Sequence, residues 1–255
     1  KLTLEDVKNF HAKFYGAQYA ELVVVGPVEQ TAFLKEAETL LAKWPTPQPY
    51  KRMAGKHRAV PIFNEKIETP DKENAQFDAA LRIQMNDTHP DYAAMLVANY
   101  MFGGTISARV PNRIRNKEGL SYGARTSFTA PSEGDNALFS ASVIANPANM
   151  PKVEKFFLEE VNLAREKGFT AEELASAKKA LKDQAAVGRS QDGALLGTIA
   201  AREQLNRTML FDEKREASFQ AVTLDQVNAA FRKYIDPAQI SIVKAGDFKK
   251  AGVWQ

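Results

Sequence analysis

An internal repeat is the feature that most restricts how this chain can fold. Residues 3–26 align without a gap with residues 223–246, at a constant offset of 220 positions. The matched positions are Thr3–Val7 with Thr223–Val227, Lys13–Phe14 with Lys233–Tyr234, and Leu22–Gly26 with Ile242–Gly246. A helix–turn–strand pattern recurs by chance in many proteins, but identical spacing over this length favours a duplication.

Both copies predict the same helix–turn–strand unit. Thr3 and Thr223 each stand three residues before Asp6 or Gln226, which is the pattern of a capping box at a helix start. Apolar residues then recur at helical spacing: Leu4, Val7, Phe10 and Phe14 in one copy, and Leu224, Val227, Phe231 and Tyr234 in the other. A β-rich run ending in glycine follows. We therefore expect residues 1–48 to be the helix–strand–helix tail of a preceding homologous unit.

A proline-rich, basic stretch separates this tail from the rest of the chain. Four of the twelve prolines fall at positions 45, 47, 49 and 61, and the same stretch carries Lys51, Arg52, Lys56, His57 and Arg58. We interpret residues 49–61 as an extended linker and residues 62–255 as a second unit. Its basic cluster is expected to be a solvated tether, with a patch for an anionic partner as the alternative. No aromatic residue interleaves these charges and the net charge is only +3, so we expect no nucleic-acid partner.

The second unit predicts an α+β fold. Alternating patterns indicate strands at 77–85, 122–128 and 138–144, the last two joined as a hairpin. Helical patterns cover 92–101, 105–117, 152–167, 170–205 with a break near 188–193, 211–222 and 224–234. Strands joined as hairpins and helices in runs are typical of a two-layer fold, in which helices pack on one face of a largely antiparallel sheet.

Several kinds of catalytic chemistry are excluded by the residues present. The chain has no cysteine, and no two of its three histidines, His11, His57 and His89, lie within four residues of one another. A helical zinc site of the His-Glu-x-x-His or His-x-x-Glu-His type therefore cannot be built. There is also no Gly-x-Ser-x-Gly nucleophile motif and no phosphate-binding loop. His89, which precedes Pro90, is expected to be a turn residue at a helix start.

A conspicuous motif begins at Gly103-Gly104-Thr105-Ile106-Ser107-Ala108-Arg109 and continues with Arg115-Asn116-Lys117-Glu118-Gly119-Leu120-Ser121-Tyr122-Gly123. It resembles the zinc-free, C-terminal half of the pitrilysin/insulinase family of zinc metallopeptidases, the inverzincins. That family has a glycine-rich stretch ending in Ser-x-Arg, followed by Arg-x-Lys/Glu-x-x-Leu-x-Tyr. The resemblance covers most of the chain and also accounts for the repeat, because family members are built from homologous α+β units arranged as two halves around a peptide chamber.

The resemblance implies a division of labour between the two halves. Zinc and its His-x-x-Glu-His motif belong to the other half, whether in the same protein or in a companion subunit, and this half binds no metal. Arg115 and Tyr122 are then the residues that reach the peptide substrate: a guanidinium suits a substrate carbonyl or carboxylate, and a phenol can donate to a developing oxyanion. The alternative is that Arg115 is a solvated helix-end charge and Tyr122 a strand residue.

Other residues of the motif have open roles. Gly103 and Gly104 either end one helix and start another or form a loop that contacts substrate, since this chain has two glycines where some family members have three or more. Arg109 is expected to anchor the helix, and both it and Arg113 are alternatives for the substrate role.

At the level of the whole protein, two functions remain. One is the substrate-binding, chamber-forming part of a zinc-dependent metalloendopeptidase, inactive as an isolated piece. The other is a catalytically inactive family member that serves as a structural or partner subunit. We expect no membrane span, since the longest apolar run is Leu22–Val25. The resemblance favours the periplasm, with the cytoplasm as the alternative.

Overall fold

The computed structural model describes residues 1–49 and 51–254 and divides into two compact units. Lys1–Met53 and Asp183–Lys214 form one; Ala54–Lys182 and Arg215–Gln255 form the other. Positions 50, within the predicted linker 49–61, and 255 lie outside the described residues. The boundaries proposed after residues 48 and 61 therefore stay a prediction, and each unit is treated separately below.

The larger unit contains a five-stranded sheet in the order β1-β5-β2-β4-β3. Its strands are β1 (Asn64–Glu68), β2 (Ala75–Gln84), β3 (Ser121–Thr129), β4 (Asn136–Ala145) and β5 (Ser241–Gly246). β2 pairs antiparallel with both β4 and β5, and β3 pairs antiparallel with β4, whereas the edge strand β1 runs parallel to β5. The predicted largely antiparallel sheet is confirmed, with β1 as an additional strand.

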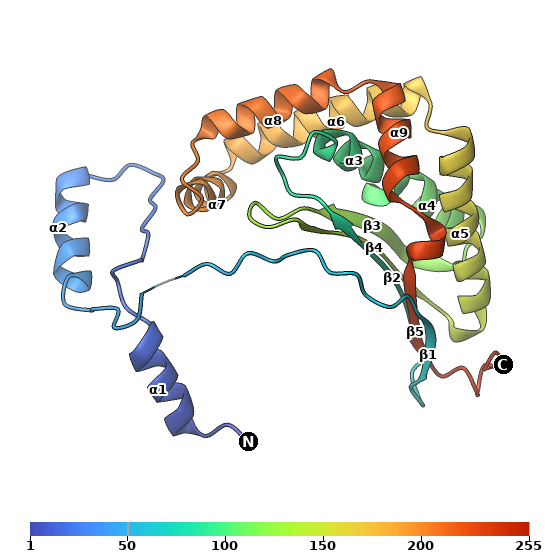
Figure 1. The fold of residues 1–255 in the computed structure, drawn as a ribbon, viewed down its shortest axis with the longest axis horizontal. Coiled ribbons are helices and arrows are strands. Elements are labelled where there is room, and N and C mark those ends of the chain that lie inside the picture. The colour runs from blue at the N-terminus through green and yellow to red at the C-terminus, as the bar shows by residue number, and fades with distance from the viewer. Residues whose placement is uncertain (50, 255) are drawn as a thin grey trace. The chain divides into compact units, whose positions relative to one another are not determined.

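Helices connect the strands, and some of them cover one face of the sheet. In chain order they are α3 (Tyr92–Asn99), the π-helical turn η1 (Tyr100–Gly104), α4 (Arg109–Pro111), the π-helical turn η2 (Asn112–Lys117), α5 (Met150–Lys167), α6 (Ala171–Ser190), α7 (Asp192–Glu203), α8 (Met209–Ala221) and α9 (Leu224–Tyr234). Figure 1 shows α3, α4, α5 and α9 on the same side of the strands. The break predicted near 188–193 falls between α6 and α7.

Strand periodicity explains which face of the sheet these helices bury. Along β2, Phe77, Ala79, Leu81 and Ile83 are buried, while Asp78, Ala80, Arg82 and Gln84 between them are exposed. β4 repeats the pattern with Ala137, Phe139, Ala141 and Val143. Because successive strand residues point to opposite faces, one face packs into the aromatic core and the other stays open.

The two copies of the repeat form matching helices but have different surroundings. α1 (Leu4–Phe14) and α9 both begin with the predicted capping box, on Thr3 and Thr223. Val227 and Phe231 of α9 are buried, whereas the apolar residues of α1 are all exposed, Val7 and Phe10 by 57% each. Both helices of the predicted helix–strand–helix tail are present, with α2 (Gln30–Leu41) as the second one.

The strand predicted at Leu22–Gly26 requires correction. No strand is formed there, whereas its counterpart at 242–246 lies within β5 between β1 and β2. A strand forms only when its backbone groups hydrogen-bond to a neighbouring strand. Among the described residues, no strand lies beside Leu22–Gly26.

Asp91 joins the start of α3 to the end of α9 and should make stability depend on pH. Its carboxylate accepts hydrogen bonds from Tyr234 Oη (2.7 Å) and Lys233 Nζ (2.9 Å), and these bonds hold the pKa of Asp91 below its usual value. A lowered carboxyl pKa adds stability above the unfolded-state pKa of about 3.9, and that stability is lost as pH falls through the folded-state pKa. We expect Asp91→Asn to be destabilised at neutral pH and to lose less stability than wild type on acidification. Urea unfolding from pH 7 to pH 2.5, with the exposed Glu65→Gln as control, measures this; parallel pH profiles for Asp91→Asn and wild type would contradict it.

Candidate functional site

The two motif segments adopt unusual local structures. Gly103-Gly104 ends the π-helical turn η1, and Arg115 lies in the π-helical turn η2. Single π-helical turns are rare and frequently occur at functional sites. Gly119 follows η2 with φ of 63°, the left-handed region in which glycine carries no steric cost, and lets the chain enter β3.

A β-bulge exposes Tyr122. Ser121 pairs with Ala145 and Gly123 with Ile144, so Tyr122 is an extra residue without a partner on β4. The Ser121 hydroxyl stabilises the bulge: it accepts from the Gly123 N–H (3.0 Å) and donates to the Ile144 carbonyl (2.6 Å). The Tyr122 side chain is 97% exposed. Bulges commonly re-aim a side chain out of the regular strand pattern, and this one presents the phenol to solvent.

Arg115 and Tyr122 line the same cavity, which has a volume of about 830 Å³ and which we call the Arg–Tyr cavity. The other lining residues come from three places: the end of η2 and start of β3, the residue before β2, and the end of β4 with the following loop. They are Asn74, Asn116, Gly119, Leu120, Ser121, Gly123, Ile144, Ala145, Asn146 and Asn149. None of the lining residues is acidic and Arg115 is the one formal charge, so the cavity suits a hydrogen-bond acceptor such as a carbonyl or carboxylate.

The three neighbouring arginines have different surroundings. Arg109 donates two hydrogen bonds of 2.7 Å to Glu173 and one of 2.8 Å to the Gly168 carbonyl, and it therefore anchors α4 to the start of α6. Arg113 lies over the ring of Phe156 and pairs with carboxylates. Arg115 has no hydrogen-bond or ion-pair partner within residues 1–49 and 51–254. It is thus the arginine of the motif that is available to a ligand.

Gly103 and Gly104, at the start of the motif, do not line the Arg–Tyr cavity. Gly103 is buried against Thr126, and a Cβ added to Gly103 would lie 2.5 Å from the Thr126 Oγ1 atom, which hydrogen-bonds Asn99. Gly104 is exposed beside the Asn99 carbonyl. The close approach of η1 to β3 accounts for glycine at position 103. A substrate-contacting role for this stretch stays a prediction.

This close approach predicts a stability effect for Gly103→Ala. The added methyl group must displace Thr126 or η1, and overpacking of this kind costs about 1–3 kcal/mol. Gly188→Ala in α6 is the control, because a Cβ there meets nothing within 4 Å and removing a helical glycine stabilises by roughly 0.5–1 kcal/mol. Chemical denaturation compares the two; equal unfolding free energies for Gly103→Ala and wild type would show that the contact is loose.

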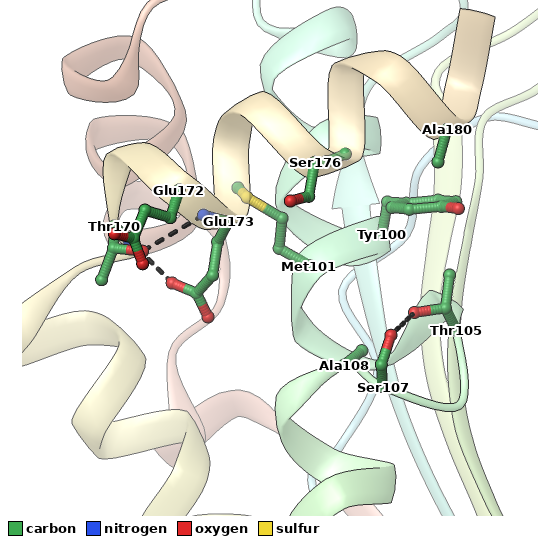
Figure 2. Close-up of a pocket in the computed structure, with 11 residues that line it drawn as sticks. Tyr100, Met101, Thr105, Ser107, Ala108, Thr170, Glu172, Glu173, Ser176 and Ala180 are labelled. Carbon is green, nitrogen blue, oxygen red and sulfur yellow. Dashed lines mark hydrogen bonds between the residues drawn. The ribbon is translucent and has the colours of Figure 1, made fainter. Parts of the chain in front are cut away.

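A second cavity, of about 430 Å³, lies between η1 and the first turns of α6 (Figure 2). Its polar groups form hydrogen bonds with one another. The hydroxyl oxygens of Thr105 and Ser107 are 3.3 Å apart, and the Glu173 carboxylate accepts hydrogen bonds from the Thr170 N–H and from Arg109. Burial acts to raise the pKa of Glu173, but these hydrogen bonds outweigh it and the pKa lies below its usual value. This cavity therefore leaves fewer polar groups available to a ligand than the Arg–Tyr cavity does. We take the Arg–Tyr cavity as the candidate site.

Among the described residues, no three or more His, Cys, Asp or Glu side chains come close enough together to hold a metal ion. These side chains therefore do not form a site for the zinc ion of the metallopeptidases that the motif resembles. His89 accepts a hydrogen bond at Nδ1 from the Asp91 N–H, which confirms it as a turn residue. No helix in the described part of the chain has the length and apolar character needed to cross a bilayer.

Comparison with known families identifies the chain. Residues 1–181 match the family described as the peptidase M16 inactive domain. The chain belongs to this family. The match confirms the resemblance to the zinc-free half of the metallopeptidases, which was drawn from the motif between Gly103 and Gly123. The inactive-domain match extends through α1, η1, η2 and α5 into α6.

Two curated relatives match nearly all of the chain. An uncharacterized zinc protease of Streptomyces coelicolor is 25% identical over 237 residues, which cover 91% of this chain and 51% of the relative. The non-peptidase homolog YmxG of Helicobacter pylori is 22% identical over 258 residues, which cover 98% of this chain and 57% of the relative. The chain therefore spans about half the length of the relatives it matches.

Solved structures confirm the fold. A peptidase M16 inactive domain from Pseudomonas fluorescens superposes with a TM-score of 0.80 at 25% identity, covering 96% of this chain and 57% of that one. The periplasmic protease PqqL of Escherichia coli superposes with a TM-score of 0.65 at 16% identity, covering 87% of this chain and 24% of that one. The predicted α+β architecture is that of M16 inactive domains.

The sequence predicts Arg115 and Tyr122 as site residues, and the structure adds four amide side chains that line the same cavity. Asn74, Asn116, Asn146 and Asn149 bring side-chain donors and acceptors into the Arg–Tyr cavity. Asn74 and Asn146 lie far from the motif in the chain and join it only because the start of β2 pairs with the end of β4. Asn116 lies within the motif, but no local pattern marks the other three asparagines as parts of a site.

Proposed function

We propose that the Arg–Tyr cavity binds a peptide that is cleaved at a zinc site carried by another unit, in the same protein or in a companion subunit. One observation carries the proposal. The Arg115 guanidinium, which has no partner among the described residues, and the outward-turned phenol of Tyr122 line one cavity, and none of its lining residues is acidic. A peptide carbonyl or terminal carboxylate is the ligand that both groups recognise.

The two residues take different parts in this function. Arg115 binds and orients the peptide through its rigid donor fork, in substrate and transition state alike. Tyr122 donates a hydrogen bond to the oxygen on which charge develops when the carbonyl is attacked. Water activation belongs to the zinc-bearing unit, because this chain lacks the ligands for it.

The repeat supports a homologous unit as a neighbour of residues 1–48. The apolar positions of α1 are exposed, although the matching positions of α9 pack against α3 and α5. We propose that a homologous unit supplies the equivalent pair of helices to α1. Amide exchange in α1 should be slower in the complete protein than in this chain; equal exchange would contradict this arrangement.

Peptide cleavage tests the division of labour. The chain alone should bind peptide without cleaving it, and zinc-dependent cleavage should appear when the zinc-bearing unit is added. Robust zinc-dependent cleavage by the chain alone would overturn the proposal.

A second candidate function rests on the relatives. The name of the H. pylori relative describes a non-peptidase homolog, and a structural or partner subunit is the equivalent role for this chain. Absence of a His-x-x-Glu-His motif from the complete protein and from its companion subunits would favour this second role.

We propose the periplasm as the compartment, and fractionation of the source cells tests it. The E. coli structure named as a periplasmic protease shares the fold at 16% identity. Recovery of the protein with cytoplasmic markers would contradict this location.

A further inference from the structure

A gap lies beside the C-terminal end of the central strand β2, at the opposite end of that strand from the Arg–Tyr cavity. β5 pairs with residues 76–80 of β2, so residues 81–84 have β4 on one side and, among the described residues, no strand on the other. Residues 57–63 pass along this open side before joining β1. Between them lies a cavity of about 740 Å³, within the range of roughly 300–1,000 Å³ typical of ligand sites.

Backbone polar groups on β2 are unpaired at this gap. The Met85 N–H donates to the Asp135 carbonyl on the β4 side. Because backbone groups alternate in direction along a strand, those of Arg82 and Gln84 point to the other side, toward the gap. In the described part of the chain these groups have no partner.

The opposite wall of the gap is also unpaired. His57 N–H donates to Asp135 and the Phe63 carbonyl accepts from Ile242, so both ends of the segment are attached to the sheet. Residues 58–62 between them make no hydrogen bond to any described residue. Two backbone runs therefore border one cavity. Apart from the nitrogen of Pro61, which carries no hydrogen, their backbone groups are able to pair with an extended chain.

The side chains indicate what kind of chain fits. Arg58 and Arg82 line the gap, are exposed, and have no ion-pair partner in residues 1–49 and 51–254. Lys233 also lines it but pairs with Asp91, and the Asp236 carboxylate caps the Ala238 N–H. The apolar lining includes Val60 and Ile62, which are 57% and 47% exposed.

We propose that the open edge of β2 binds an extended peptide strand in which acidic residues alternate with apolar ones. Its backbone pairs with Arg82 and Gln84 in the manner of β-augmentation, its carboxylates face Arg58 and Arg82, and its apolar side chains cover Val60 and Ile62. This assigns the basic linker residue Arg58 to an anionic partner. The site is independent of the Arg–Tyr cavity and does not rest on the proposed cleavage function.

Fluorescence anisotropy with labelled eight-residue peptides tests the site on the full 255-residue chain. The probe alternates Glu and Val; one control alternates Lys and Val, and a second is the Glu–Val peptide with alternate amides N-methylated. We expect the Glu–Val peptide to bind and both controls to bind at least fivefold more weakly, since the first reverses the charge and the second removes strand hydrogen bonds. Equal affinity of the N-methylated peptide would overturn strand pairing.

Protein variants locate the peptide. Arg82→Gln should weaken Glu–Val binding by about two- to fivefold, as expected for an exposed ion pair, whereas Arg125→Gln, on the same open face but on β3, should leave it unchanged. Bound peptide should slow amide exchange at Arg82 and Gln84 and not along β3. Protection of β3 instead, equal effects of the two variants, or equally effective displacement by a single-stranded oligonucleotide would each overturn the assignment.

Discussion

Replacing Tyr122 with Phe in the complete protein should, on the proposed division of labour, lower kcat by about a hundredfold to a thousandfold, the range for loss of one oxyanion donor. The substitution removes a single hydroxyl from a side chain that is 97% exposed. The bulge that presents it depends on the Ser121 hydroxyl, which is unchanged. The fold should therefore be intact, and the loss should appear in kcat rather than in stability.

Steady-state kinetics on a peptide substrate measures this effect. The matched control is Tyr15→Phe, which removes the same hydroxyl from another exposed tyrosine, in Lys1–Met53, outside the Arg–Tyr cavity. The unfolding midpoints of both variants should equal that of the wild type. An unchanged kcat in Tyr122→Phe would make Tyr122 an ordinary surface residue of the strand.

Lys244→Met should destabilise the larger unit by about 3–5 kcal/mol, the cost of leaving a buried charge without its partner. Lys244 is a lysine on the helix-covered face of β5, and its side chain is only 6% exposed. It pairs with Glu154 of α5 and donates to Asn64 of β1 at 2.8 Å. The single substitution leaves the Glu154 carboxylate, which is 19% exposed, without its cation.

Two further variants separate the lost pair from the lost side chain. Lys244→Met combined with Glu154→Leu should recover most of the stability, since removing both members of a buried pair is often neutral. Lys155→Met removes a lysine from an exposed pair on the same helix, with Glu159, and should cost no more than about 0.5 kcal/mol. Urea denaturation gives the unfolding free energies. A double variant as unstable as Lys244→Met would mean that the ion pair is not the cause.

Features carried by local sequence patterns were predicted from the sequence. The capping boxes on Thr3 and Thr223, the β3–β4 hairpin and the amphipathic α5 depend on residues close together in the chain. The repeat and the motif around Arg115 then led to the family without the structure.

Features that depend on distant residues were not predictable. β1 is a short, mostly polar edge strand that exists because β5 lies beside it. The strand expected at Leu22–Gly26 has the right composition, but the described part of the chain contains no strand beside it. The bulge at Tyr122 requires the register of β4, and the pairing of Lys244 with Glu154 joins residues far apart in the chain. In each case the missing information is tertiary contact.

Peptide affinity of the Arg–Tyr cavity is the most direct test of the proposed function. The probe is an N-acetylated peptide with uncharged side chains and a free carboxylate, titrated calorimetrically into the 255-residue chain and into two variants. Arg115→Ala should weaken binding by about tenfold or more, the contribution of hydrogen bonds to a charged group. Arg125→Ala, an exposed arginine farther along β3 and outside the cavity, should leave binding unchanged. Equal affinities for wild type and Arg115→Ala would contradict the assignment of this cavity as the peptide site.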